Sequence, residues 1–193
     1  MPRGILLARC LLLTGLMLLT ERLALAQGTI DFKNTAIVSG SPMVNAPVIC
    51  QDGTRAAGTA FRAALYAGAP GTTPDQLRMI GLATGFSTAP AGAGFFLGGT
   101  RTLNENGVNI TPGAPVTLQV RAWVVASGST WETATQRGQS DTFTVTSGGA
   151  GVPAGPPSLM VGLTSFSVVP EPSTIALGII GGLGTLFLVR RRK

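Results

Sequence analysis

Few residues of this chain could carry out chemistry, because its 193 residues include no histidine. A Ser-His-Asp triad, an imidazole metal ligand and a histidine general base are therefore excluded. Cys50 is a nucleophile by residue type, but it follows Val48 and Ile49, a context typical of a small buried side chain. Without a histidine to activate its thiol, we expect no catalytic role for Cys50. The sequence therefore predicts a protein that is not an enzyme.

Metal and phosphate sites are not supported by the residue pattern either. The segment 104–107, Asn-Glu-Asn-Gly, offers oxygen atoms, but calcium takes about six to eight ligands and one carboxylate is too few. A polar hairpin turn is the more typical role of such a segment. The segment 92–99 has four glycines but lacks the Gly-Lys-Ser/Thr ending of a phosphate-binding loop. We expect no metal and no cofactor.

One set of residues is suited to binding carbohydrate. Tyr66, Arg121, Trp123 and Trp131 are the residue types that a glycan platform uses, with the rings stacked on sugar faces. The same residue types more often fill the core or the edge of a β-sandwich. The two hypotheses differ in exposure, because a platform requires rings that lie together on a solvent-facing surface.

The elements that must position these side chains lie in residues 27–169, whose pattern is that of short β-strands. Apolar and more polar residues alternate over 116–125 and over 61–67, the period of a half-buried strand. Shorter segments of the same kind are 29–32, 48–50, 95–97, 141–146 and 163–169. In 141–146, Phe143 and Val145 are expected to point inward. Turn sequences separate the strands, at Asp52-Gly53, Ala69-Pro70-Gly71, Asn106-Gly107, Ser127-Gly128 and Gly148-Gly149.

This pattern predicts a mainly β fold, an antiparallel β-sandwich of the immunoglobulin-like or jelly-roll type. A β-solenoid is less favoured, because no repeat of fixed period is present. Helix is expected to be nearly absent from the body, and only 74–80 and 131–136 are modest helix candidates.

Residues 1–26 have the order of a secretory signal peptide. Arginines precede an apolar run over 10–19, and Ala24 and Ala26 form the small-residue pattern before a cleavage site at Gln27. The apolar run is too short to span a membrane comfortably. We therefore expect cleavage by signal peptidase after Ala26, in preference to a retained anchor or an amphipathic first helix.

The formal net charge of +6 lies mostly at the two ends of the chain. Residues 27–169 hold seven cations and six acids, and the cations are dispersed along the sequence. A nucleic-acid surface requires cations clustered on one face, so we expect no nucleic-acid partner. Of the two cysteines, Cys10 would leave with the signal peptide. Cys50 alone could then form no intramolecular disulfide.

Residues 170–193 contain three parts in a specific order. Pro170, Glu171 and Pro172 are expected to be extended and accessible, because prolines remove backbone donors. Residues 173–189 are uncharged and would span about 25 Å as a transmembrane helix. The basic end consists of Arg190, Arg191, Arg192 and Lys193. By the positive-inside rule this end stays cytoplasmic, which places the body on the far side of the inner membrane.

Together these parts resemble the PEP-CTERM sorting signal. The resemblance implies processing by an exosortase, an integral membrane enzyme of Gram-negative bacteria that commonly make exopolysaccharide, which would read Pro170, Glu171 and Pro172. It also implies a transient membrane anchor, followed by delivery to the cell surface or the extracellular space. A plain single-pass anchor is the alternative. More loosely, the body is similar to exported β-rich proteins with this tail, in segments 28–32, 64–68 and 119–123.

Two functions are open at this stage. The first is a noncatalytic surface or extracellular-matrix protein, trimmed at its tail and associated with exopolysaccharide. The second is a glycan-binding module that uses exposed aromatic residues of the sandwich. An enzyme ranks third.

Overall fold

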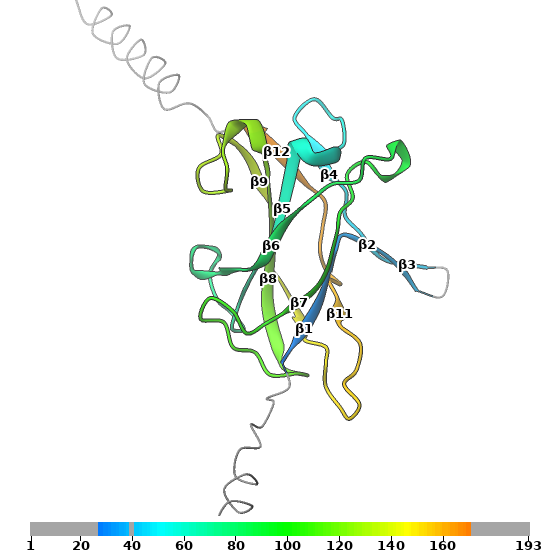
Figure 1. Ribbon diagram of the computed structural model, residues 1–193, viewed down its shortest axis with the longest axis vertical. Helices are drawn as coiled ribbons and strands as arrows, with labels where there is room; N and C mark the ends of the chain where they lie inside the picture. Colours follow the sequence, from blue (N-terminus) through cyan, green and yellow to red (C-terminus); the bar gives the residue numbers. More distant parts are fainter. Residues whose placement is uncertain (1–26, 39–40, 171–193) are drawn as a thin grey trace, which may run out of the picture.

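The computed structural model describes residues 27–38 and 41–170 and is drawn in Figure 1. In these residues the chain forms β-strands and short 3-10 turns, and no α-helix. The strands are β1 (Thr29–Lys33), β2 (Thr35–Val38), β3 (Ser41–Asn45), β4 (Val48–Cys50), β5 (Phe61–Gly68), β6 (Arg78–Gly85), β7 (Leu97–Thr102), β8 (Pro115–Val124), β9 (Gln136–Gln139), β10 (Phe143–Thr146), β11 (Ser158–Leu159) and β12 (Phe166–Pro170). The mainly β fold class is confirmed, and the expected transmembrane helix over 173–189 lies outside the described residues.

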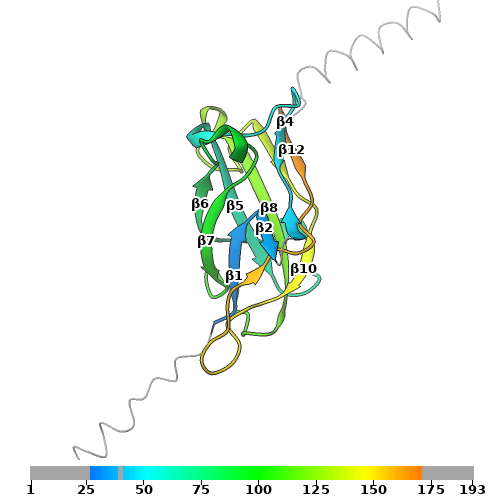
Figure 2. The ribbon, with the colours of Figure 1, turned by 90° about the vertical axis from the view of Figure 1, so that its right-hand side faces the viewer.

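The strands form a large sheet, a small sheet and a hairpin. The large sheet has the order β4-β12-β9-β8-β5-β6, with β10 also paired to β8, and the small sheet has the order β11-β1-β7. In Figure 2, β6 and β7 lie at one side of the body and β4 and β12 at the other. The hairpin of β2 and β3 projects from the body (Figure 1). Two pairings are parallel, β1 with β11 and β4 with β12, so the sheets are mostly but not purely antiparallel.

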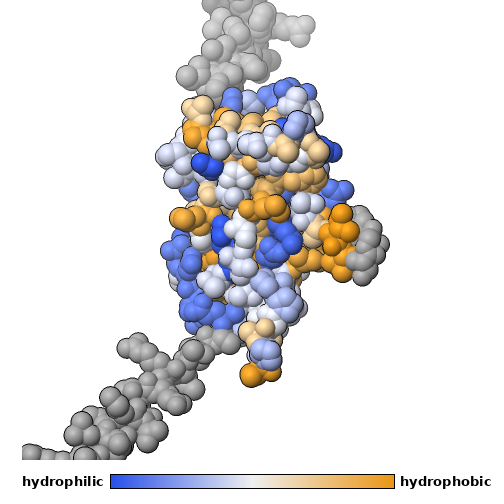
Figure 3. Space-filling view, turned by 45° about the vertical axis from the view of Figure 1, so that its right-hand side comes forward, coloured by the Kyte–Doolittle hydropathy of each residue, from blue (hydrophilic) through white to orange (hydrophobic). Residues whose placement is uncertain are grey.

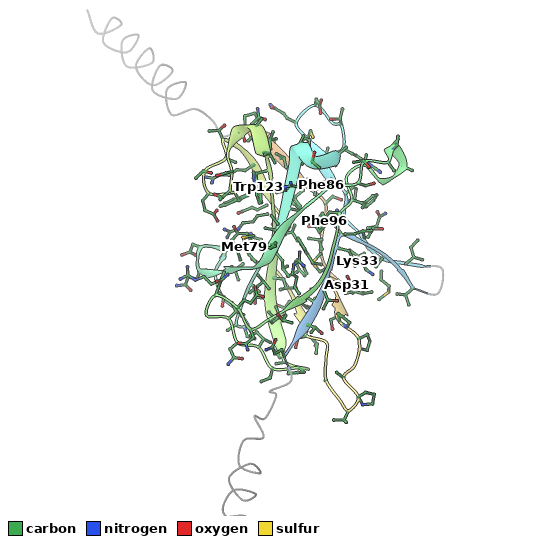
Figure 4. All side chains as sticks on the ribbon, in the orientation of Figure 1. Asp31, Lys33, Met79, Phe86, Phe96 and Trp123 are labelled. Carbon is green, nitrogen blue, oxygen red and sulfur yellow. The ribbon has the colours of Figure 1, made fainter. Side chains whose placement is uncertain are left out.

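One hydrophobic core collects side chains from both sheets. Ile30 and Phe32 enter it from β1 and Leu118 enters it from β8, and all three are fully buried. The ring of Phe96 lies between two others, with its centroid 4.7 Å from that of Phe32 and 5.5 Å from that of Phe86 (Figure 4). Burial of aromatic rings of this size contributes a large share of the hydrophobic stabilisation of a small domain.

The alternation in the sequence is reproduced where it was strongest. The apolar residues of β8 are buried in the main core, namely Val116, Leu118, Val120 and Ala122. In β10, Phe143 and Val145 pack against this core while Thr144 and Thr146 are exposed. The local period of two therefore predicted correctly which side chains enter the main core, while the opposite face of β8 is buried as well.

The two candidate helices are not formed in the described body. Only Pro74–Gln76 makes a 3-10 turn before β6 begins, and residues 131–135 precede β9 without regular structure. Pairing of β6 with β5 and of β9 with β8 supplies backbone hydrogen bonds that helices of two turns or less could not match. Two expected strands are also shifted, since β7 begins at Leu97 and β12 runs from 166 to 170.

The outer edge of β6 is covered by side chains from the segment that follows β7. The Glu105 carboxylate accepts the backbone N–H of Gly81 at 2.8 Å, and the Asn106 amide donates to the Met79 carbonyl at 2.7 Å. The Arg101 guanidinium donates to another β6 carbonyl at 2.9 Å. These bonds occupy backbone groups that would otherwise be free to pair with another chain. The segment 104–107 therefore protects a sheet edge.

The root of the projecting hairpin is fixed by Asn34, which lies between β1 and β2 and is fully buried. Its amide nitrogen donates to the carbonyls of Ala46 at 2.7 Å and Gly94 at 2.8 Å. Its side-chain oxygen accepts the backbone N–H of Phe96 at 2.8 Å. A single side chain thus joins three segments and leaves their buried backbone groups satisfied.

Replacement of Asn34 by alanine should lower the free energy of unfolding by about 3 kcal/mol, because three buried hydrogen bonds of about 1 kcal/mol each are lost. The measurement is urea unfolding of the purified body. Asn45→Ala is the matched control, since Asn45 is exposed on the same hairpin, and it should change stability by less than about 0.5 kcal/mol. Equal effects of the two changes would contradict this role of Asn34.

Candidate functional site

The end of the folded body coincides with the start of the Pro-Glu-Pro segment. Strand β12 lies between β4, to which it is parallel, and β9, to which it is antiparallel. Val169 is opposite Arg137 and Pro170 is opposite Gln136. Pro170 is exposed and ends the strand, consistent with the missing N–H of proline. Glu171 and Pro172 lie outside the described residues.

A hollow of about 390 Å³ lies beside Pro170 at this end of the large sheet. Its lining includes Cys50, Asp52 and Val168. The Asp52 carboxylate already accepts the backbone N–H of Thr54 at 2.9 Å and its hydroxyl at 2.6 Å, and these bonds lower the pKa of Asp52. The thiol of Cys50 therefore shares the hollow with a carboxylate that is engaged in its own turn.

The four residues expected to bind glycan do lie together, but they form a stack. The Arg121 guanidinium carbon lies 4.0 Å from the ring centroid of Tyr66 and 4.4 Å from that of Trp131. On its other side Trp131 contacts Arg137, at 4.3 Å. Rings and guanidinium groups thus alternate, an arrangement stabilised by cation–π attraction. Trp123 packs in the same small cluster.

This cluster is covered, an arrangement that matches the core-or-edge hypothesis for these residues and differs from the exposed platform that glycan binding would require. Tyr66 and Trp123 are each 4% exposed and Arg121 is 7% exposed, while Trp131 is half-buried. The segment before β6 and the turn before β9 lie over this face of β5 and β8, and Leu77 joins the cluster. Rings that are buried in this way have no free face on which a sugar could stack.

The polar atoms of Tyr66, Arg121 and Trp131 bond to neighbours that the sequence did not single out, whereas the buried indole nitrogen of Trp123 has no hydrogen-bond partner among the described residues. The Tyr66 hydroxyl donates to a Glu132 carboxylate oxygen at 2.6 Å, and Arg121 donates from Nε to the Gln119 side chain at 2.9 Å. The Trp131 indole donates to a backbone carbonyl of β9 at 3.0 Å. No periodicity marks Glu132, because its contact with Tyr66 joins residues that are 66 positions apart.

Burial and this bonding shift the pKa values of the stack. Burial and the hydrogen-bonded Glu132 carboxylate raise the pKa of Tyr66 far above its usual value, and Arg121 offsets only part of this effect. Burial lowers the pKa of Arg121. Burial alone would raise the pKa of Glu132, but the hydrogen bond from Tyr66, together with backbone bonds and Arg121, lowers it. Tyr66 is therefore a neutral donor to an ionised carboxylate at neutral pH.

Most of the other expected site residues lie outside the described residues, namely Ala24, Ala26, Arg190, Arg191, Arg192 and Lys193. Gln27 is the first described residue and is exposed. Among residues 27–38 and 41–170, no group of cysteine and acidic side chains is arranged to hold a metal ion. The same residues include no helix of the length and apolar character needed to cross a membrane.

Exposed apolar side chains occur on the hairpin. Ile37 is 71% exposed and Met43 is 47% exposed, and Figure 3 shows this arm as a hydrophobic area beside the body. No local signal predicts this arm, because a separate two-stranded element has the same local pattern as a strand within a sheet.

Comparison with known proteins identifies the end of the chain. A family model described as the PEP-CTERM protein-sorting motif matches residues 168–193. No curated protein and no solved structure matches the chain.

A β-rich body followed by this motif defines an exported protein that is sorted through its carboxyl-terminal end. The chain carries the PEP-CTERM sorting motif, and the resemblance found in residues 170–193 is confirmed. The motif implies that an exosortase is the processing partner and that the destination is the cell surface or the extracellular space. The match begins at Val168, so it includes the last three residues of β12.

Replacement of Arg121 by alanine should lower the free energy of unfolding by about 3 kcal/mol, because two ring contacts and the bonds to Gln119 and Pro74 are lost together. Urea unfolding measures the change. Arg78→Ala is the control, since Arg78 is exposed on β6, and it should leave stability within about 0.5 kcal/mol of the parent. A loss of polysaccharide retention with unchanged stability would instead indicate a binding role for Arg121.

The usual pKa of tyrosine is about 10, but that of Tyr66 is raised. The tyrosinate absorbance of the folded protein should therefore not develop at that pH. The chain contains one tyrosine, so this signal reports Tyr66 alone. Because the folded pKa is raised, Tyr66 contributes stability below about pH 10 that is lost as pH rises toward the folded pKa.

The same titration in urea should show the usual pKa. Glu132→Gln should move the folded titration to lower pH, since it removes the carboxylate that disfavours the phenolate. Identical titration curves for the folded and unfolded parent protein would show that Tyr66 is not held as described.

Proposed function

We propose that this protein is a noncatalytic surface or extracellular-matrix protein that an exosortase trims at its Pro-Glu-Pro tail. The single observation that carries the proposal is the position of the matched motif, which starts in the last strand of the body and continues to Lys193. The body from Gln27 to Pro170 is then the cargo, and residues 1–26 and 171–193 serve delivery.

The two ends of the chain supply the route in this proposal. Signal peptidase cuts after Ala26, and Gln27 becomes the new amino terminus. The segment 173–189 anchors the chain transiently in the inner membrane, with the basic end in the cytoplasm. The exposure of Gln27 supports cleavage at this point, because a peptidase must reach the peptide bond before this residue.

A role without catalysis is supported by the residue content. The whole chain lacks histidine, and Cys50 shares its hollow with a carboxylate bonded to Thr54. Association with exopolysaccharide follows from the class of bacteria that the sorting system implies. The alternative of a glycan-binding module loses its support on β5 and β8, because Tyr66 and Trp123 are buried.

Replacing Pro170 and Pro172 together by alanine should leave the body folded and make the unprocessed membrane form accumulate. Pro170 is exposed at the end of its strand, so the body loses little packing, while an enzyme that reads the motif loses both rigid residues. Immunoblots of membrane and secreted fractions, with a tag after Gln27, measure the ratio of the two forms.

The matched control replaces Pro70 and Pro90 by alanine, because both are exposed prolines within the body. This control should be processed at the parental rate. The proposal is wrong if the Pro170 and Pro172 variant is processed as fast as the parent.

A further inference from the structure

The matched sorting motif and the folded body share three residues, Val168, Val169 and Pro170. We propose that β12 controls the rate of processing: the membrane enzyme acts on chains in which the end of β12 has separated from β9. This inference rests on the proposed function and adds a regulatory step to it.

Strand β12 has a different partner along each part of its length. Its residues 166–168 pair with β4 and its residues 169–170 pair with β9. Val168 is 4% exposed and contributes to the main core. Gly138 of β9 approaches the backbone of β12 so closely that a Cβ atom there would collide with the Ser167 carbonyl. The strand is thus an inner member of the sheet, with neighbours on each edge.

An enzyme that cuts near Pro170 needs the same backbone groups that the sheet uses. Extended peptides are commonly bound by main-chain hydrogen bonds, with alternate side chains in pockets. In the folded body these groups are paired with β4 and β9, and the Val168 side chain faces the core. Ser167, Val169 and Pro170 have exposed side chains, but the backbone groups of Ser167 lie within the pairing with β4, so the accessible end of the strand is Val169, at 42% exposed, and Pro170.

Separation of the last two residues is a local event. Pro170 donates no backbone hydrogen bond, and the paired register with β9 comprises only Val169 with Arg137 and Pro170 with Gln136. Strand ends of this kind open without global unfolding, and cleavage of an opened segment follows its equilibrium population when opening is fast. Freeing Val168 as well would require loss of its core contacts. The backbone before Val169 is therefore much less accessible to the enzyme than Val169 and Pro170.

The chemical step itself is an ordinary acyl transfer. One backbone amide near the motif is broken, and the tail leaves with the nitrogen, which takes up a proton. A nucleophile, water in the simplest case, bonds to the carbonyl carbon and supplies the oxygen of the new carboxylate. The body keeps all of β12, so folding after cleavage is unchanged.

The test uses the full chain in cells that process it. A spacer of Gly-Ser-Gly-Ser-Val-Val inserted after Val169 moves the motif away from the sheet while keeping two valines before Pro170. Pulse-chase labelling measures the rate at which the tail is lost. We expect the spacer to raise this rate by about tenfold, the factor for removing about 1.4 kcal/mol of pairing. The same spacer inserted before Val152, in an exposed turn, should leave the rate unchanged.

A second variant separates stability from sequence recognition. Val48→Ala weakens the β4 partner of β12 and lies outside the matched motif. It should leave the rate of tail loss unchanged both in the parental spacing and in the chain with the spacer, because local separation of residues 169 and 170 from β9 leaves the pairing of 166–168 with β4 in place.

The outcomes distinguish the inference from the function on which it rests. Equal rates for the parent and the spacer chain, both processed, would overturn control by β12 and leave the proposed function intact. Retention of the tail by every variant, including the parent, would overturn both. Faster tail loss caused by Val48→Ala would also overturn the inference, because the rate would then depend on the stability of the whole body and not on local separation of residues 169 and 170 from β9.

Discussion

The pairing of β12 between β4 and β9 is the constraint on which the rest of this structure depends. It joins β4 to the rest of the large sheet, places Val168 in the core and leaves the neighbouring Pro170 exposed at the surface. The boundary between body and sorting tail is therefore set by backbone hydrogen bonding, with no linker between the two. A tail joined in this way can be removed without loss of core residues, and the fold of the body determines how closely an enzyme can approach.

On the face of the large sheet that carries Tyr66 and Trp123, a small cluster replaces the polar surface that alternation alone would predict. Arg121 lies between Tyr66 and Trp131, and its charge is compensated by ring faces and hydrogen bonds. Such a stack fixes the turn before β9 and thereby fixes β9 itself, which is the antiparallel partner of β12. Strand β9 thus connects the stack of Tyr66, Arg121 and Trp131 to the end of β12, where the sorting motif begins.

The parts of the fold that could be predicted are those with a local signal. The alternation of β8 and β10 gave the correct inward faces, and the order of proline, apolar and basic residues after Val169 identified the sorting motif, because an enzyme reads such a tail as an extended sequence. Strands β6 and β9 were missed because their pairing with distant neighbours overrides weak local preferences. The burial of Tyr66 and Trp123 depends on segments far away in the sequence, and no spacing indicates it.

The intact mass of the protein isolated from its native host shows directly whether both ends of the chain are removed. We predict a species that begins at Gln27 and ends near Pro172, without the basic residues 190–193. A mature species that still carries those four residues would contradict this prediction.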